Sequence, residues 1–280
     1  MNIAAAISSA AAALQDAGIA EPRREASWLL AFVIKQDAVF LIAHSDESLA
    51  APYKMMFEAC VRRRAKHEPF QYITGRQEFY GLDFEVTPDV LIPRPETEIL
   101  VEKAIEILSD IVSPRFCEIG VGSACISVSV LHSVKNSTAV GVDISEKALD
   151  VARRNAEKND VVDRLTLIEG DVFDRLDERF EMIVSNPPYV PAVQLASLQA
   201  EVRDFEPRVA LAGGDDGLDI IERIVIGAPP YLRQDGTLLM EIGFDQSERV
   251  AALFDQRLWS DPEFIDDLQQ IPRIVHAKLR

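Results

Sequence analysis

The sequence predicts a two-part α/β protein, in which a small helical bundle precedes a larger domain built on a mostly parallel sheet. Two observations lead to this class. Residues 2–75 carry apolar side chains at three- and four-residue spacing, which is typical of amphipathic helices. From about residue 95 onward, short strand-like runs alternate with helical segments, and such alternation places helices on both faces of a parallel sheet.

The N-terminal part is expected to contain four helical segments, at residues 2–18, 22–36, 38–44 and 51–67. Gly18 ends the first segment and Pro22 begins the second. Helices of this length are unstable alone, so they should pack together as a bundle. The Ala-rich start lacks a basic residue and carries Asp16, which favours a first helix over a secretory signal.

A hairpin should connect the two parts. In residues 77–87, QEFYGLDFEVT, apolar side chains lie on either side of Gly81. We therefore expect three regions, a helical domain at 1–75, a β-hairpin linker at 76–88 and an α/β domain at 89–280.

The second domain should alternate strands and helices to its end. Ser145 is the expected N-cap of one of these helices. Strands are expected at 115–120, 137–144, 164–171, 180–186, 236–243, 263–267 and 271–278, and helices at 95–112, 123–134, 145–159, 217–233 and 245–254.

Charge and cysteine content narrow the class of function. The net charge is −17, and residues 86–280 carry thirty-five Asp and Glu against twenty Lys and Arg. An acidic body repels polyanions and suits a cationic ligand or a basic partner, although solubility explains the acidity equally well. The three cysteines (Cys60, Cys117 and Cys125) lack metal-site spacing, and no apolar run approaches the roughly 20 residues of a membrane span. We expect a cytoplasmic protein without a metal.

Two strand ends carry residues typical of a nucleoside site. Glu118–Ala124 forms a Gly-containing turn between a strand and a helix, where ligands bind in open α/β sheets. Asp143 ends the next strand, 23 residues after Gly120, and is suited to ribose hydroxyls, although a helix N-terminus also favours an acid there. The third glycine of a dinucleotide turn is absent, and Glu118 disfavours phosphate. S-adenosylmethionine, a cationic nucleoside without phosphate, therefore fits better than NAD.

A third strand ends in Asn186-Pro187-Pro188-Tyr189. The Asn side chain offers a carbonyl acceptor, and the prolines fix φ and carry no N–H, so the carbonyls of 186 and 187 can face a ligand. With Tyr189 as a flat wall, this array suits a planar amino group. An ordinary proline turn is the alternative, which the buried strand before it and the glycine turn disfavour.

These motifs resemble the class I S-adenosylmethionine-dependent methyltransferases that act on planar amino groups, and more narrowly the release-factor glutamine N5-methyltransferases. The similarity runs over nearly the whole chain. It includes residues 68–98 with IPRPETE, CEIGVGSACI (117–126), GVDIS (141–145), EGDVF (169–173), SNPPYVP (185–191) and FEPRVALAGGDDGLD (205–219).

The resemblance implies a seven-stranded Rossmann-like catalytic domain with one reversed strand, and a helical domain that binds the protein substrate. It assigns the cofactor to Glu118, Gly120, Val121, Gly122, Ser123, Ala124, Asp143, Asp171, Val172 and Asn186. It assigns the target amide to Asn186, Pro187, Pro188 and Tyr189, with Pro93, Arg94 and Glu96 shaping a lid. Glu118, Ala124 and Val172 replace the family's usual Asp, Gly and aromatic residue, which leaves Phe173 as the candidate for stacking on adenine.

The implied function is methylation of the glutamine in the Gly-Gly-Gln motif of peptide-chain release factors, by a monomer that binds no nucleic acid directly. Three alternatives stay open, which are a glutamine methyltransferase of a ribosomal protein, a nucleic-acid adenine N6-methyltransferase and a non-catalytic cofactor-binding protein. The NPPY sequence alone does not separate the release-factor activity from the first two alternatives. The basic run at 62–66 is either a docking patch or a solvated helix face.

Overall fold

The computed structural model describes all 280 residues, which divide into two compact units. The first unit contains Met1–Arg76 together with Gln199–Phe205. The second contains Gln77–Leu198 and Glu206–Arg280. Helices make up the first unit and an α/β sheet the second, so the predicted fold class is confirmed.

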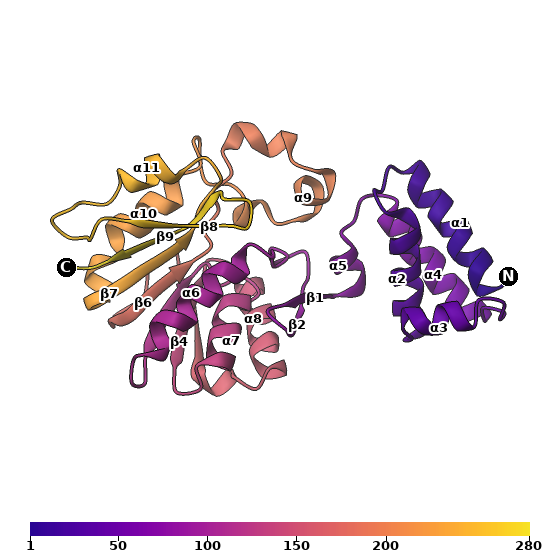
Figure 1. Cartoon of the computed structure of the whole chain (residues 1–280), viewed down its shortest axis with the longest axis horizontal. Coiled ribbons are helices and arrows are strands. Elements are labelled where there is room, and N and C mark those ends of the chain that lie inside the picture. Colours follow the sequence, from indigo (N-terminus) through magenta and orange to yellow (C-terminus); the bar gives the residue numbers. More distant parts are fainter. The chain divides into compact units, whose positions relative to one another are not determined.

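The first unit is an all-helical bundle (Figure 1). Gly18 follows its first helix with a φ of 80°, and Pro22 is the first residue of its second helix, as predicted. Its buried core includes Leu14, Leu29 and Phe57. The helices are α1 (Ile3–Asp16), α2 (Pro22–Ile34), α3 (Ala38–Ala43), α4 (Ala51–Arg64), α5 (Phe70–Thr74) and α9 (Ala200–Phe205).

One buried cation connects three of these helices. Arg64 ends α4 and is only 4% exposed. Its guanidinium forms ion pairs with Glu25 of α2 and, at 2.6 Å, with Glu201 of α9. A buried charge is stable only when it is paired, so Arg64 depends on a carboxylate that lies far along the chain.

The second unit is built on a seven-stranded sheet, preceded by the hairpin of β1 (Arg76–Phe79) and β2 (Leu82–Glu85). The strand order is β5-β4-β3-β6-β7-β9-β8. Only β9 runs opposite to the other six strands, and it is the reversed strand that the resemblance implies. The strands are β3 (Arg115–Ile119), β4 (Thr138–Asp143), β5 (Leu165–Glu169), β6 (Phe180–Ser185), β7 (Leu232–Glu241), β8 (Glu263–Asp266) and β9 (Pro272–Lys278).

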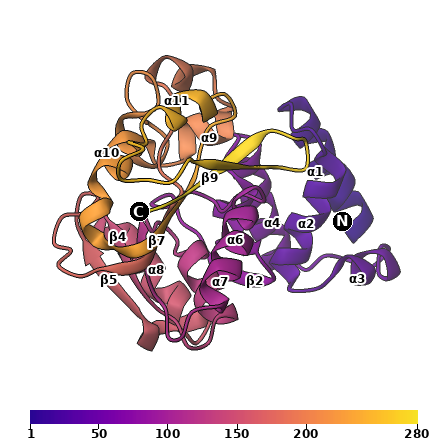
Figure 2. The ribbon, with the colours of Figure 1, turned by 60° about the vertical axis from the view of Figure 1, so that its left-hand side comes forward.

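Helices cover both faces of this sheet (Figure 2). One face packs against α6 (Thr97–Ser109), α7 (Cys125–Ser133) and α8 (Glu146–Lys158). The other packs against α10 (Asp219–Gly227) and α11 (Ser247–Ala251). Because successive strand residues point to opposite faces, Phe116 joins the first core and Cys117 the second.

Local signals set several helix ends. Ser145 caps α8 by accepting a hydrogen bond from the Ala148 amide at 3.2 Å, as predicted. The helix expected at 217–233 ends at Gly227 instead, and Pro229–Tyr231 forms a 3₁₀ turn, since the prolines there lack the N–H that an α-helix requires. Each helix of the structure is too short or too polar to cross a membrane.

Candidate active site

A cavity of about 300 Å³ lies in the second unit, at the carboxyl ends of β3, β4 and β6. This is the edge of an open α/β sheet where ligands bind. The predicted residues that do not line the cavity include Glu96, Ala124, Pro187 and Tyr189. The predicted residues that do are Pro93, Arg94, Glu118, Gly120, Val121, Gly122, Ser123, Asp143, Asp171, Val172, Asn186 and Pro188.

The glycine turn has an unusual backbone. Gly120, Gly122 and Ala124 all lie in the left-handed region, with φ of 72°, 51° and 61°. The amides of Gly120 and Val121 donate to the Val142 carbonyl at 2.8 and 3.0 Å, which fixes the turn on β4. Ala124 therefore adopts the conformation that glycine adopts at lower cost, and its methyl group is fully buried in the core.

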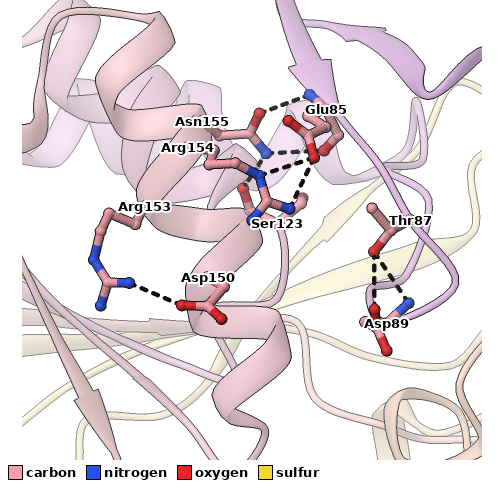
Figure 3. A network of polar contacts seen from close by, with 8 residues as sticks. All are labelled: Glu85, Thr87, Asp89, Ser123, Asp150, Arg153, Arg154 and Asn155. Atoms are coloured by element: carbon pink, nitrogen blue, oxygen red, sulfur yellow. Dashed lines mark hydrogen bonds and ion pairs between the residues drawn. The ribbon is translucent and has the colours of Figure 1, made fainter.

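The rear of this turn is held by Asn155, a fully buried residue of α8 (Figure 3). Its Nδ2 donates to the carbonyls of Ser123 and Glu85, both at 2.9 Å, and its Oδ1 accepts from the Glu85 amide at 2.6 Å. One side chain thus connects the turn, α8 and the hairpin strand β2. Sequence reasoning missed this residue, because nothing in its own segment distinguishes it from other polar residues of a helix.

Asp143 is held by two backbone amides. Its Oδ2 accepts from Gly122 at 2.8 Å, and its Oδ1 accepts from Ser145 at 2.9 Å. Burial raises the pKa of Asp143, and these hydrogen bonds partly oppose that increase. The carboxylate is thereby fixed at the cavity wall with lone pairs remaining for a ligand. Its bond to the Ser145 amide places it at the N-terminus of α8, and ribose binding stays a prediction.

Glu118 is the most deeply buried acid of the cavity wall. It is 1% exposed, and Ser127 donates to its Oε2 from both the backbone amide, at 2.8 Å, and the hydroxyl. Burial raises the pKa of Glu118 to about 8, although the Ser127 bonds act in the opposite direction. At neutral pH a nearby cation would favour the ionised form.

The charges around the cavity favour a cationic ligand. Its wall includes four carboxyl groups, from Asp89, Glu118, Asp143 and Asp171, and two guanidinium groups, from Arg94 and Arg223. Both guanidiniums already have partners, because Arg94 pairs with the buried Glu206 and Arg223 with Asp171 at 2.9 Å. No unpaired cation is left to hold a phosphate. The lining therefore fits S-adenosylmethionine, which carries an ammonium and a sulfonium.

Stacking on an adenine is not provided by Phe173. Its ring stacks on Tyr231 instead, with centroids 4.9 Å apart, and does not line the cavity. Val172 does line it, in the left-handed region with φ of 57°. The apolar contact at this position is therefore aliphatic.

The Asn186 side chain lies at the cavity wall and is held by a buried polar network. Its Nδ2 donates to the Thr97 hydroxyl at 3.1 Å, and that hydroxyl donates to Glu241 at 2.6 Å. The Tyr189 hydroxyl donates to the other oxygen of Glu241 at 3.2 Å. Burial raises the pKa values of Glu241 and Tyr189. Sequence reasoning missed Thr97 and Glu241, although Glu241 ends a buried strand as Asp143 does.

A second contact set holds the backbone after Asn186. The side-chain Nε2 of Gln246 donates to the carbonyls of Tyr189 and Gly217, both at 3.1 Å. The backbone amide of Val190 donates to the Leu211 carbonyl at 2.9 Å. A Cβ at Gly213 would lie 2.7 Å from the Pro188 carbonyl oxygen. Glycine is therefore required for the close approach of residues 211–217 to the Asn-Pro-Pro-Tyr segment.

Comparisons with known proteins cover both units. A family model described as the PrmC N-terminal domain matches residues 5–75, and one described as the methyltransferase small domain matches residues 96–202. A release factor glutamine methyltransferase of Geobacter sulfurreducens is 43% identical, over 95% of this chain and 93% of the relative. A release factor glutamine methyltransferase of Cereibacter sphaeroides is 39% identical, over 100% of this chain and 99% of the relative. The solved structure of a methyltransferase from Pyrococcus furiosus shares the fold, with a TM-score of 0.52 at 16% identity over 71% of this chain and 90% of that one.

Proposed function

Because the chain belongs to the family of release factor glutamine methyltransferases, we propose that it methylates the side-chain nitrogen (N5) of the glutamine in the Gly-Gly-Gln motif of peptide-chain release factors. The observation that carries the proposal is the state of Asn186. One of its two amide hydrogens is donated to Thr97 at 3.1 Å, which fixes the orientation of the amide and leaves the Oδ1 atom available as an acceptor at the cavity wall.

The cavity would hold S-adenosylmethionine. In this proposal Glu118 and the turn at Gly120–Ser123 would hold the methionine part, Asp143 the ribose, and Asp171 and Val172 the adenine; support comes from their position in the wall of one cavity. When bound, this cofactor supplies a methyl group on sulfonium sulfur, and transfer breaks the S–C bond and forms an N–C bond on the amide, which then loses one proton.

The chain's own contribution is orientation and electrostatics. A carboxamide nitrogen is a weak nucleophile because its lone pair is delocalised into the carbonyl. Asn186 Oδ1 and the Pro187 carbonyl would accept its two N–H bonds, and these acceptors bind more strongly as nitrogen becomes positive. Tyr189 would support the plane of the amide from a position fixed by Glu241. Holding the amide at the approach distance supplies much of the acceleration.

The remaining roles concern the protein partner. We propose that Arg94, fixed by Glu206, and Pro188 shape the entrance for the glutamine loop, and that the helical unit binds the body of the release factor. The acidic second unit suits a basic surface around that loop. We expect a cytoplasmic monomer whose partner is protein rather than nucleic acid.

One assay separates the candidate substrates. The protein is incubated with radiolabelled S-adenosylmethionine and, separately, with a release factor, a large-subunit ribosomal protein or DNA. We expect label on the release factor, and none on a release factor in which the Gly-Gly-Gln glutamine is replaced by alanine. Label on the ribosomal protein or DNA alone would refute the proposal.

Two substitutions test the residue roles. Asn186→Ala should reduce kcat by about 10²–10³-fold, as expected for loss of one transition-state acceptor, while S-adenosylmethionine affinity stays within a few-fold. Asp143→Ala should instead weaken calorimetric affinity for the cofactor. Near-normal turnover in the first variant, or unchanged affinity in the second, would reject the assigned role.

A further inference from the structure

We infer that Thr97 and Glu241 set the orientation of the Asn186 amide, and so make the site accept a glutamine side chain and reject a glutamate one. The inference rests on the proposed function and adds to it the source of its substrate selectivity. Thr97 and Glu241 are positioning residues, since they act through Asn186.

The hydrogen-bond chain has a direction. Glu241 ends β7 and is 3% exposed, and its two carboxylate oxygens each receive a hydroxyl, from Thr97 at 2.6 Å and from Tyr189 at 3.2 Å. Because both oxygens of Glu241 accept from a hydroxyl, the single hydroxyl hydrogen of Thr97 is committed to Glu241. The Thr97 oxygen then has only lone pairs left for Asn186.

That direction decides which end of Asn186 is available. Because Thr97 Oγ1 can only accept, Asn186 must turn Nδ2 toward it, as the 3.1 Å contact records. Asn186 Oδ1 is then an acceptor without a competing donor beside it. Thr97 is 2% exposed, so water does not replace this contact freely. Reversing the Thr97 hydroxyl would let Asn186 rotate its amide and present Nδ2 instead.

The consequence is a choice between two nearly isosteric side chains. A glutamine amide brings two N–H donors to the acceptors Asn186 Oδ1 and the Pro187 carbonyl. A glutamate carboxylate brings only acceptors, and unpaired acceptors facing each other in a desolvated site are strongly disfavoured. We expect the wild-type protein to bind the glutamine form of the release factor at least about a hundredfold more tightly than the glutamate form.

Glu241→Gln tests the direction of the chain. A glutamine at 241 offers an N–H donor to Thr97, which allows the Thr97 hydroxyl to donate to Asn186 and the Asn186 amide to rotate. We expect selectivity for glutamine over glutamate to fall by at least about tenfold, with the glutamate form becoming a better competitive inhibitor. Calorimetric affinity for S-adenosylmethionine should stay within a few-fold, which establishes that the variant is folded.

Two substitutions of Thr97 supply the matched pair. Thr97→Val keeps the shape but loses the oxygen, and it should lower kcat about tenfold or more and reduce selectivity. Thr97→Ser keeps the oxygen and should preserve both. If Glu241→Gln and Thr97→Val both lower kcat but leave the selectivity for glutamine over glutamate unchanged, the inference is overturned. That pattern is expected when a substitution merely makes the site less rigid. Failure of the wild-type protein to methylate the release factor would instead refute the proposed function.

Discussion

Glu118 gives the most direct test of how the cavity recognises its cofactor. This buried acid has a pKa of about 8, so about nine-tenths of the molecules carry a proton on Glu118 at pH 7. If the carboxylate holds the ammonium of S-adenosylmethionine, binding must remove that proton. We therefore expect release of about 0.9 proton per cofactor bound at pH 7 and an affinity that rises about ninefold from pH 6 to pH 7.

The measurement is isothermal titration calorimetry in two buffers that differ in ionisation enthalpy. Over pH 6 to 7 the cofactor's own ammonium stays largely protonated, since an α-amino group titrates near pH 7.7–8.0. Glu118→Gln is the matched control, because it keeps the shape and can still accept from Ser127. It should bind more weakly, with little dependence on pH and almost no proton release. Equal proton release in wild type and Glu118→Gln would refute the reasoning.

The same pKa has a consequence for stability. A carboxyl group whose pKa is higher in the folded state than its ordinary value of 4.5 favours folding in its protonated form. Its contribution is complete below about pH 4.5 and declines as pH rises toward 8. Chemical denaturation of the cofactor-free protein should thus show a smaller decline in unfolding free energy over this window for Glu118→Gln than for wild type.

Three further substitutions test the scaffold. Ala124→Gly should leave the free energy of unfolding within about 1 kcal/mol of wild type. Relief of the left-handed strain at this position is offset by loss of a buried methyl group and by a more flexible unfolded chain. A decrease of more than about 2 kcal/mol, measured by urea unfolding, would contradict this expectation. Asn155→Leu should lower the free energy of unfolding by about 1–3 kcal/mol and weaken cofactor binding in calorimetry, because the Ser123 and Glu85 carbonyls lose their hydrogen-bond donor. The control is Arg153→Ala, an exposed position on the same helix, which should change neither quantity. Gly213→Ala should lower kcat more than it changes cofactor affinity, because its Cβ would displace the Pro188 carbonyl; unchanged kcat in the methylation assay would show that this contact relaxes freely.

The sequence predicted what depends on short segments and on sheet topology. Ser145 and Pro22 act at the ends of their own helices, where local chemistry decides the outcome. Glu118, Asp143 and Asn186 could be assigned to one site because parallel strands bring their carboxyl ends to the same edge. Each of these inferences needs only the order of elements along the chain.

What the sequence could not predict are contacts that depend on packing between distant segments. Thr97 and Glu241 are 144 positions apart, and Asn155 and Ser123 are 32 apart. Such pairs are brought together by the detailed packing of helices on the sheet, and the sequence of a single segment does not indicate which distant residue it will contact. The orientation of the Asn186 side chain follows from this packing. The Asn-Pro-Pro-Tyr motif can therefore be recognised in the sequence, whereas the orientation of its Asn cannot.

The pairing of Arg64 with Glu201 affects how this protein can be divided. Because Gln199–Phe205 belongs to the first unit, the polypeptide passes between the units three times, after residues 76, 198 and 205. A proteolytic cut at Arg76 would leave two covalent connections intact. A fragment ending there would lack Glu201, one of the two acids that neutralise a guanidinium only 4% exposed. The helical unit is thus built from two separate stretches of the chain, and a swap between relatives would have to exchange residues 1–76 and 199–205 together.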